Sequence, residues 1–243
     1  MPADEGVRHV IARAELIKEV GATFRNPWAT EDAYVVPAPE DIRLRQNHAK
    51  HFDDAVVLYA DIDASTSMVD SQGWQFAAEC YKNYLRCAAE CITGNEGIIT
   101  AYDGDRVMGV YTGNAKCTNA ARTALNINFC VEEIIRPAYA FYGKSFVFNH
   151  VVGIDRSELY AIRIGVRGET DITWVGRAAN YAAKLCTKGG KSIWISEAVY
   201  ERLHDQVKFN TETPTGVDMW TPDYWMPMLP SPVYGSNWYR RFP

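Results

Sequence analysis

The chain has 243 residues, with 47% hydrophobic residues, 23% charged residues and a net charge of −5 at pH 7. This is the composition of an ordinary globular protein, and without a basic block neither nucleic acid nor an anionic membrane is favoured as a partner. No apolar run approaches the roughly 20 residues that span a bilayer, and the N-terminal sequence lacks a signal-peptide pattern. We therefore expect no membrane association and a cytoplasmic location.

Residues 1–52 are predicted to form an N-terminal extension, because a short helical pattern there is followed by prolines in an aromatic, charged stretch. One folded domain is expected over residues 53–209. It opens with the apolar run Ala55–Ala60, which is typical of a strand buried on both faces. A turn at Asp70–Gly73 then leads into a helix predicted over about Trp74–Ile92.

A hairpin and a second helix are predicted next. Two strand-like runs, Gly97–Tyr102 and Arg106–Tyr111, flank Asp103-Gly104, and Asp-Gly is a strong signal for a two-residue hairpin loop. The second helix is predicted over Ala115–Ile135, with Pro137 stopping it.

The C-terminal half continues with strands predicted at Val147–Ile154 and Leu159–Val166, a helix from near Ala178, and a strand at Ser192–Ser196. The order β-α-β-β-α-β-β-α-β indicates an α+β fold with a ferredoxin-like βαββαβ core, in which helices cover a mainly antiparallel sheet. Residues 210–243 are rich in proline and aromatic side chains, so this tail is expected to pack on the domain or on a second subunit.

Two aspartates stand where the predicted elements turn. Asp61 leaves the end of the first strand, and Asp105 follows the tip of the hairpin. If the hairpin lies beside that strand, the two carboxylates meet at one edge of the sheet, where Mg²⁺ between them forms a site for phosphoryl transfer. The alternative is that both are ordinary turn residues that cap or face solvent.

The third predicted helix adds polar groups to this hypothesis. It begins after Gly176 and carries Asn180 and Lys184 four residues apart, hence on one face. An amide and a cation on one helical face can hold a ribose and a triphosphate. An ordinary amphipathic helix with a solvated lysine has the same pattern.

Together, the three segments resemble the class III nucleotidyl cyclases, the adenylate and guanylate cyclase homology domain. In that family a strand ends Phe-Ala-Asp-Ile, a hairpin carries Gly-Asp-x-x-Met, and a further segment reads Gly-x-x-x-Asn-x-x-x-Arg. The corresponding segments here are Tyr59–Ile62, Gly104–Met108 and Gly176–Lys184, in the same order. The resemblance covers roughly residues 53–205.

The resemblance implies a head-to-tail homodimer with active sites at the subunit interface. Asp61 and Asp105 of one subunit would bind two Mg²⁺ or Mn²⁺ ions, helped by the main-chain carbonyl of Ile62. Asn180 of the other subunit would orient the ribose of a nucleoside triphosphate for in-line attack on the α-phosphate. Lys184 stands where the family has a transition-state arginine, and a lysine supplies the charge without the bidentate fork.

Departures from the family pattern bear on the base that is bound. Familiar adenylate cyclases have a lysine three residues before the hairpin glycine and an Asp or Thr seven residues before the asparagine; here these positions hold Ala101 and Thr173. One contact to adenine is therefore lacking, and no glutamate is present to select guanine. Tyr59 replaces the phenylalanine of the base pocket, which suits a smaller base, and Arg106 adds a donor-only group for base carbonyls.

These departures resemble the pyrimidine cyclases, which make cyclic UMP or cyclic CMP in bacterial antiphage signalling. Uracil offers its O4 carbonyl to a donor such as Arg106, whereas cytosine has an amine there, so UTP is favoured as the substrate. The resemblance also implies a separate effector protein that responds to the cyclic nucleotide.

Other functions stay open at this point. The chain could be a cytidylate cyclase, or an adenylate cyclase that reads its base by another route, since some adenylate cyclases have a threonine at the position of Thr173. It could also be an inactive cyclase-fold module that binds nucleotides; Lys184 favours this alternative, whereas the retained aspartates and Asn180 argue against it. Four residues could replace the family's C-terminal phosphate-binding lysine: Lys188, Lys191, Arg240 and Arg241.

Overall fold

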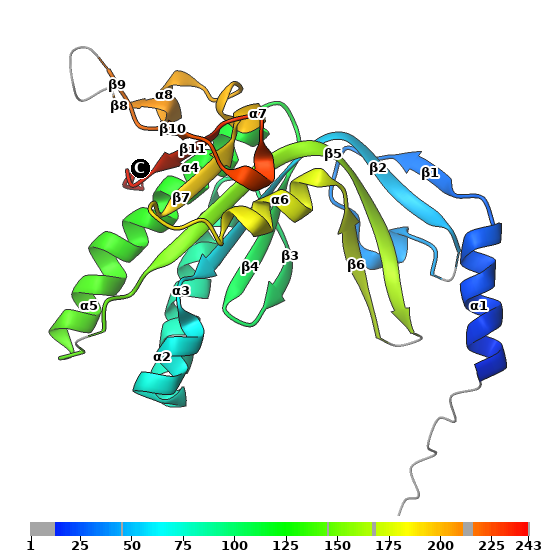
Figure 1. Ribbon diagram of the computed structural model, residues 1–243, viewed down its shortest axis with the longest axis horizontal. Helices are drawn as coiled ribbons and strands as arrows, with labels where there is room; N and C mark the ends of the chain where they lie inside the picture. The colour runs from blue at the N-terminus through cyan, green and yellow to red at the C-terminus, as the bar shows by residue number, and fades with distance from the viewer. Residues whose placement is uncertain (1–12, 45, 145, 167–168, 211–215, 243) are drawn as a thin grey trace, which may run out of the picture.

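The computed structural model describes residues 13–44, 46–144, 146–166, 169–210 and 216–242 (Figure 1). The strands in this part of the chain are β1 (Ala29–Asp32), β2 (His48–Ile62), β3 (Ile98–Asp103), β4 (Arg106–Tyr111), β5 (His150–Val166), β6 (Glu169–Val175), β7 (Ile193–Ser196), β8 (Phe209–Asn210), β9 (Val217–Asp218), β10 (Thr221–Asp223) and β11 (Val233–Ser236). The α-helices are α1 (Arg13–Arg25), α2 (Ser65–Gln72), α3 (Trp74–Gly94), α4 (Lys116–Cys130), α5 (Arg136–Phe141), α6 (Arg177–Leu185), α7 (Glu197–Tyr200) and α8 (Asp205–Lys208).

Nine of the described strands form one sheet with the order β10-β11-β7-β5-β2-β4-β3, in which β1 also pairs with β2 and β6 with β5. The pairs are antiparallel except β1–β2 and β5–β7. The run β2-α3-β3-β4-α4-β5 is a βαββαβ unit whose four strands stand as β5-β2-β4-β3. The predicted α+β class, with a mainly antiparallel sheet and covering helices, is confirmed.

Strand β2 is the centre of this sheet, because β4 pairs with one side of it and β5 with the other. Two neighbours satisfy its backbone polar groups, and helices cover both faces, which explains the apolar run Ala55–Ala60. The strand begins at His48, before the predicted domain boundary at residue 53, and β1 from the predicted extension pairs with this early part.

The prediction of two strands between residues 147 and 166 was wrong, because β5 is one continuous strand. The polar residues of its middle suggested a turn. In the structure Asp155, Arg156 and Ser157 all pair with β2, and a register shift in β2 accommodates them. Arg156 also donates to the Asp54 carboxylate at 2.7 Å. Pairing with β2 and this ion pair therefore satisfy polar groups whose positions in the sequence suggested a solvent-exposed turn.

Two helix boundaries also differ from the prediction. The helix expected to stop at Pro137 continues, because a π-helical turn over Val131–Ile135 joins α4 to α5, and Pro137 lies in the first turn of α5. An interrupted hydrogen-bond ladder tolerates a residue without an N–H. The predicted turn at Asp70–Gly73 forms the end of the additional helix α2, and Gly73 separates it from α3.

Helices cover the two faces of the sheet unequally. Helices α3 and α4 pack on one face, where alternate β2 residues such as Leu58 and Ala60 join the larger core cluster. Helix α6 lies on the other face with Val57 (Figure 1). Close approach of α6 to β5 requires Gly153, because a Cβ there would lie 2.2 Å from the carbonyl oxygen of Ala182.

The C-terminal tail packs on its own domain. Strand β11 pairs with β7, and β10 pairs with β11, so the tail extends the main sheet by two strands. Beyond β11 the chain follows α4, where the Arg240 N–H donates to the carbonyl of Leu125 at 3.1 Å. Among the described residues, no helix is both long and apolar enough to cross a membrane.

The contact at Gly153 gives a prediction about stability. Gly153→Ala should lower the free energy of unfolding by about 1–3 kcal/mol, because α6 must move away from the sheet. Gly189→Ala is the control, since a Cβ there meets no atom within 4 Å, and its effect should stay within about 0.5 kcal/mol. Urea denaturation measures both variants, and equal losses would contradict the tight contact.

Candidate active site

Strand β2 places the side chain of Asp61 on the α6 side of the sheet. Side chains alternate along a strand, and Leu58, Ala60 and Ile62 all belong to the core under α3 and α4. Tyr59 packs against the opposite cluster. Asp61 therefore shares the α6 side with Tyr59, and its side chain is only partly exposed.

Asp105 reaches the same edge through the β3–β4 hairpin. Asp103 pairs with Arg106, so the two loop residues are Gly104 and Asp105, one position later than predicted. Gly104 has φ +62°, and Asp105 has no positive φ, which is the pattern of a type II′ turn. Arg106 also pairs with Asp61 across β2 and β4. The hairpin therefore does lie beside the first strand, with the two carboxylates one position apart in register.

This arrangement raises the pKa of Asp61 to about 6. Burial is the largest cause, and the negative charge of Asp105 is the next, while Arg106 acts in the opposite direction. A carboxylate whose charge is disfavoured by burial and by a second carboxylate nearby forms a site that a cation would stabilise.

The donor chemistry fits a hard divalent ion. Carboxylate oxygens suit Mg²⁺ and Mn²⁺, which take few protein ligands when substrate phosphates supply the rest. The described residues contain no group of three or more His, Cys, Asp or Glu side chains able to hold a metal, so the aspartate pair would depend on such additional oxygens. The Ile62 side chain is buried in the core, and the role of its carbonyl stays a prediction.

The fold brings together three of the four predicted base-binding residues. Ala101 pairs with Met108 and packs against the same cluster as Tyr59. The guanidinium carbon of Arg106 lies 5.8 Å from the centroid of the Tyr59 ring, a cation–π contact. Ala101, Tyr59 and Arg106 thus line one face beside the carboxylates.

Thr173 does not join this group within the chain. It lies on β6, paired with Ile162 of β5, in the hairpin that projects from the body of the domain (Figure 1). Its neighbours Ile172 and Trp174 contact the α6-side cluster. By alternation, Thr173 faces the other way.

Sequence reasoning missed the role of Asp103, which it treated only as a turn residue. Asp103 accepts a hydrogen bond from Arg106 at 2.7 Å across the hairpin loop. The signal was available, because the two residues flank a two-residue loop and carry opposite charges. Asp103 therefore fixes the orientation of Arg106.

Helix α6 presents Asn180 and Lys184 on its exposed side. The ammonium of Lys184 lies 5.1 Å from the centroid of the Tyr181 ring, and the Arg177 guanidinium lies 5.0 Å from the same centroid. Arg177 and Tyr181, which the sequence analysis did not single out, thus extend this polar face. The signal for both was helical spacing, because Arg177 lies three residues before Asn180 and Tyr181 three residues before Lys184.

The polar face of α6 makes no direct polar contact with the aspartate pair among the described residues. No hydrogen bond or ion pair between described residues joins Asn180 or Lys184 to Asp61 or Asp105.

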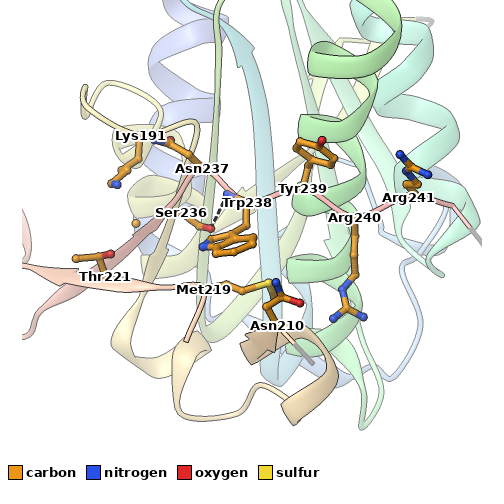
Figure 2. A pocket seen from close by; sticks show the side chains of 11 residues that line it. Lys191, Asn210, Met219, Thr221, Ser236, Asn237, Trp238, Tyr239, Arg240 and Arg241 are labelled. Atoms are coloured by element: carbon orange, nitrogen blue, oxygen red, sulfur yellow. Dashed lines mark hydrogen bonds between the residues drawn. The ribbon is translucent and has the colours of Figure 1, made fainter. Parts of the chain in front are cut away.

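The candidate phosphate-binding cations lie elsewhere. Lys188 donates to Asp223 at 2.7 Å and stacks on Trp194. Lys191, Arg240 and Arg241 line a hollow of about 870 Å³ that is bordered by residues of β8, β10 and the segment from Gly235 onward (Figure 2). Figure 2 shows Lys191 and Arg241 at opposite ends of this hollow, so the three cations do not converge on one point.

Comparison with solved structures identifies the fold. A solved adenylyl cyclase, CyaB from P. aeruginosa, superposes with a TM-score of 0.66 over 79% of this chain and 97% of that structure, at 19% identity. The fold is therefore that of the class III nucleotidyl cyclases. No family model matches the chain.

Relatives with higher sequence identity show the family to which this chain belongs. A protein named uridylate cyclase from Burkholderia cepacia is 52% identical over 212 residues, which is 87% of this chain and 91% of that protein. A uridylate cyclase from Xanthomonas perforans is 44% identical over 88% of this chain and 92% of that protein. This chain belongs to the uridylate cyclase family, and the expected relationship to pyrimidine cyclases is confirmed.

The raised pKa of Asp61 predicts a pH-dependent cost to stability. A carboxyl group whose pKa is raised by folding lowers the free energy of unfolding when it is ionised. This loss begins as pH rises above the unfolded-state pKa of roughly 4 and is complete above the folded-state pKa. The folded-state pKa is about 6 here. Without divalent ions, Asp61→Asn should therefore raise the melting temperature at pH 7.5 much more than at pH 4.

Asp63→Asn is the matched control, because it removes the same formal charge from an exposed position two residues away. Calorimetry in EDTA at both pH values measures the effect. A stabilisation by Asp61→Asn that is the same at pH 4 and pH 7.5 would show that ionised Asp61 carries no such cost.

Proposed function

We propose that this protein converts UTP to 3′,5′-cyclic UMP and pyrophosphate. The observation that carries the proposal is the sequence identity of this chain to uridylate cyclases over nearly their whole length. The placement of Asp61 and Asp105 at one edge of the sheet supports it, because cyclisation of a nucleoside triphosphate is a phosphoryl transfer that depends on positioning and charge stabilisation.

Asp61 and Asp105 would hold two Mg²⁺ or Mn²⁺ ions together with the carbonyl of Ile62. When bound, such ions lower the pKa of the ribose 3′-hydroxyl and stabilise charge on the departing pyrophosphate. The protein's contribution is to hold two carboxylates near each other at a partly buried edge despite their repulsion. A cation bound between the two carboxylates would turn this repulsion into attraction.

The complete active site would form in a homodimer. Asn180 of the partner subunit would hydrogen-bond the ribose and align its 3′-hydroxyl with the α-phosphate. The partner's Lys184 would stabilise negative charge in the transition state. Contact with the Tyr181 ring restrains this flexible side chain, which offsets part of the loss of the rigid arginine fork.

Recognition of uracil would involve Tyr59, Arg106 and Ala101, with Thr173 contributed from the projecting hairpin. Tyr59 fills the space next to Ala101 and leaves room for a small base. Arg106, held by Asp103, keeps N–H groups on the guanidinium that suit the O4 carbonyl of uracil and not the N4 amine of cytosine. CTP and ATP are the alternative substrates.

We also propose that the product is a second messenger in bacterial antiphage defence and acts on a separate cyclic-nucleotide-responsive effector. This role would place the enzyme in the cytoplasm, where UTP is available. An inactive nucleotide-binding module is the remaining alternative, favoured only by the lysine at position 184.

Product analysis tests the activity directly. The purified protein is incubated with each of the four ribonucleoside triphosphates and Mn²⁺ or Mg²⁺, and the products are identified by mass spectrometry. UTP should give cyclic UMP at the highest rate, and Asp61→Ala should abolish it. Cyclic CMP or cyclic AMP as the main product would select an alternative substrate, and nucleotide binding without turnover would select the inactive module.

Mixed dimers test the shared active site. Asp61→Ala and Asn180→Ala should each be inactive alone. After dissociation and mixing in equal amounts, about a quarter of wild-type activity should return, because half of the dimers are mixed and each then holds one intact site. The control is a mixture of Asp61→Ala chains with Asp105→Ala chains, prepared in the same way. This mixture should stay inactive, since both changes affect the same half of the site.

A further inference from the structure

A chain of buried polar groups joins the C-terminal tail to the core. Asn128 of α4 is fully buried, and its Nδ2 donates to the main-chain carbonyls of Asn237 and Trp238, each at 3.0 Å. Its Oδ1 lies 3.0 Å from Nε2 of His150, which is 4% exposed at the start of β5.

The chain continues from His150 to the candidate metal site. The hydroxyl of Tyr84, a fully buried residue of α3, lies 3.2 Å from Nδ1 of His150. The same hydroxyl lies 3.4 Å from the main-chain carbonyl oxygen of Asp61. Three side chains from α4, β5 and α3 thus connect the tail with the back of the strand that carries Asp61.

The hydrogen-bond directions in this chain are fixed by its chemistry. An amide oxygen only accepts, so Nε2 of His150 carries the hydrogen that Asn128 receives. Burial, and then the positive charge of Arg136, lower the pKa of His150 to about 3, so the ring is neutral. Nδ1 must therefore accept from the hydroxyl of Tyr84. The single hydrogen of that hydroxyl is shared between Nδ1 and the Asp61 carbonyl oxygen, the two acceptors within reach.

We propose that Tyr84, His150 and Asn128 are positioning residues that fix the main chain at Asp61 and link its position to the docked tail. The inference rests on the proposed function, because it takes Asp61 as a metal ligand. None of the three would touch substrate, since they approach from the α3–α4 side while the carboxylate lies on the α6 side.

The location of the contact explains why Asp61 needs such support. Asp61 is the penultimate residue of β2, and the strand ends at Ile62, which pairs with His150. Beyond this point the main chain leaves the sheet. Metal sites tolerate ligand displacements of only about half an ångström, and groups behind the ligands commonly set their orientation.

The polar chain is also costly unless it serves a purpose. It places a phenol, an imidazole and an amide in a mainly apolar layer, where a partly satisfied network destabilises the fold. Tyr111 provides the contrast. It is also almost fully buried in this layer, but its hydroxyl donates locally to Thr123 at 2.9 Å and does not contact Asp61.

The test compares Tyr84→Phe with Tyr111→Phe, since each removes one buried hydroxyl with one hydrogen-bond partner or more. The probe is Mn²⁺ in the presence of 3′-deoxy-UTP, which lacks the attacking hydroxyl, and electron paramagnetic resonance measures free Mn²⁺. Tyr84→Phe should weaken Mn²⁺ binding about tenfold and lower kcat more than it raises KM for UTP. Tyr111→Phe should lower the melting temperature comparably but leave Mn²⁺ binding within about twofold.

A second pair tests the link to the tail. Asn126 is the matched control for Asn128, because both are buried on α4 and both hold tail carbonyls, Asn126 through the carbonyl of Arg240 at 2.9 Å. In contrast to Asn128, Asn126 interacts on its other side with Asn95. Asn128→Ala should weaken Mn²⁺ binding as Tyr84→Phe does, and Asn126→Ala should not.

The outcomes separate this inference from the proposed function. If wild-type protein is active and Tyr84→Phe binds Mn²⁺ as tightly as Tyr111→Phe, the positioning role is wrong and the cyclase activity stands. If the wild type neither forms a cyclic product nor binds Mn²⁺ better than Asp61→Ala does, the proposed function fails and the inference fails with it. Should Asn126→Ala and Asn128→Ala weaken Mn²⁺ binding equally, the tail acts through packing and not through His150.

Discussion

The unfavourable charge of Asp61, which burial and then the nearby carboxylate of Asp105 both oppose, is the constraint on which the candidate site depends. Folding brings both carboxylates to one edge of the sheet, and the pKa of Asp61 rises because its charge is unfavourable there. Because the two carboxylates repel each other, the surrounding structure must hold them in place. The central position of β2, paired on both sides, provides a support rigid enough to do so, and a bound cation would convert the unfavourable arrangement into a favourable one.

Much of this arrangement could be predicted from local sequence. The run Ala55–Ala60 predicted a strand buried on both faces, and Asp103-Gly104 predicted a tight hairpin, whose loop lies one position later in the structure. Prediction failed where distant partners decide the outcome. The polar middle of β5 remains a strand because β2 pairs with it and Asp54 neutralises Arg156, and Pro137 is tolerated because a π-turn precedes it. Neither partner is visible in a local window.

The supporting groups of the site were hidden for the same reason. Tyr84, His150 and Asn128 lie on three elements that are far apart in sequence, and each taken alone resembles a core residue. Asp103 was closer to detection, because its charge faces Arg106 across a two-residue loop. Sequence reasoning therefore finds the residues that carry chemistry, through their spacing, more readily than the residues that hold them, whose partners appear only once the chain has folded.

The face of α6 bears on the substitution of lysine for the family's arginine. A lysine loses more freedom than a guanidinium for each hydrogen bond that it forms, and it presents a point charge. In this chain the ring of Tyr181 lies about equally far from Lys184 and from Arg177, so one aromatic side chain restrains two cations on the same face. Arg177 is also held by buried Asp155, with Nε 3.5 Å from Oδ2. The helix thus carries a guanidinium about two turns from Lys184. Under the proposed function, the positive charge offered to a triphosphate would be shared between two side chains that contact the same ring.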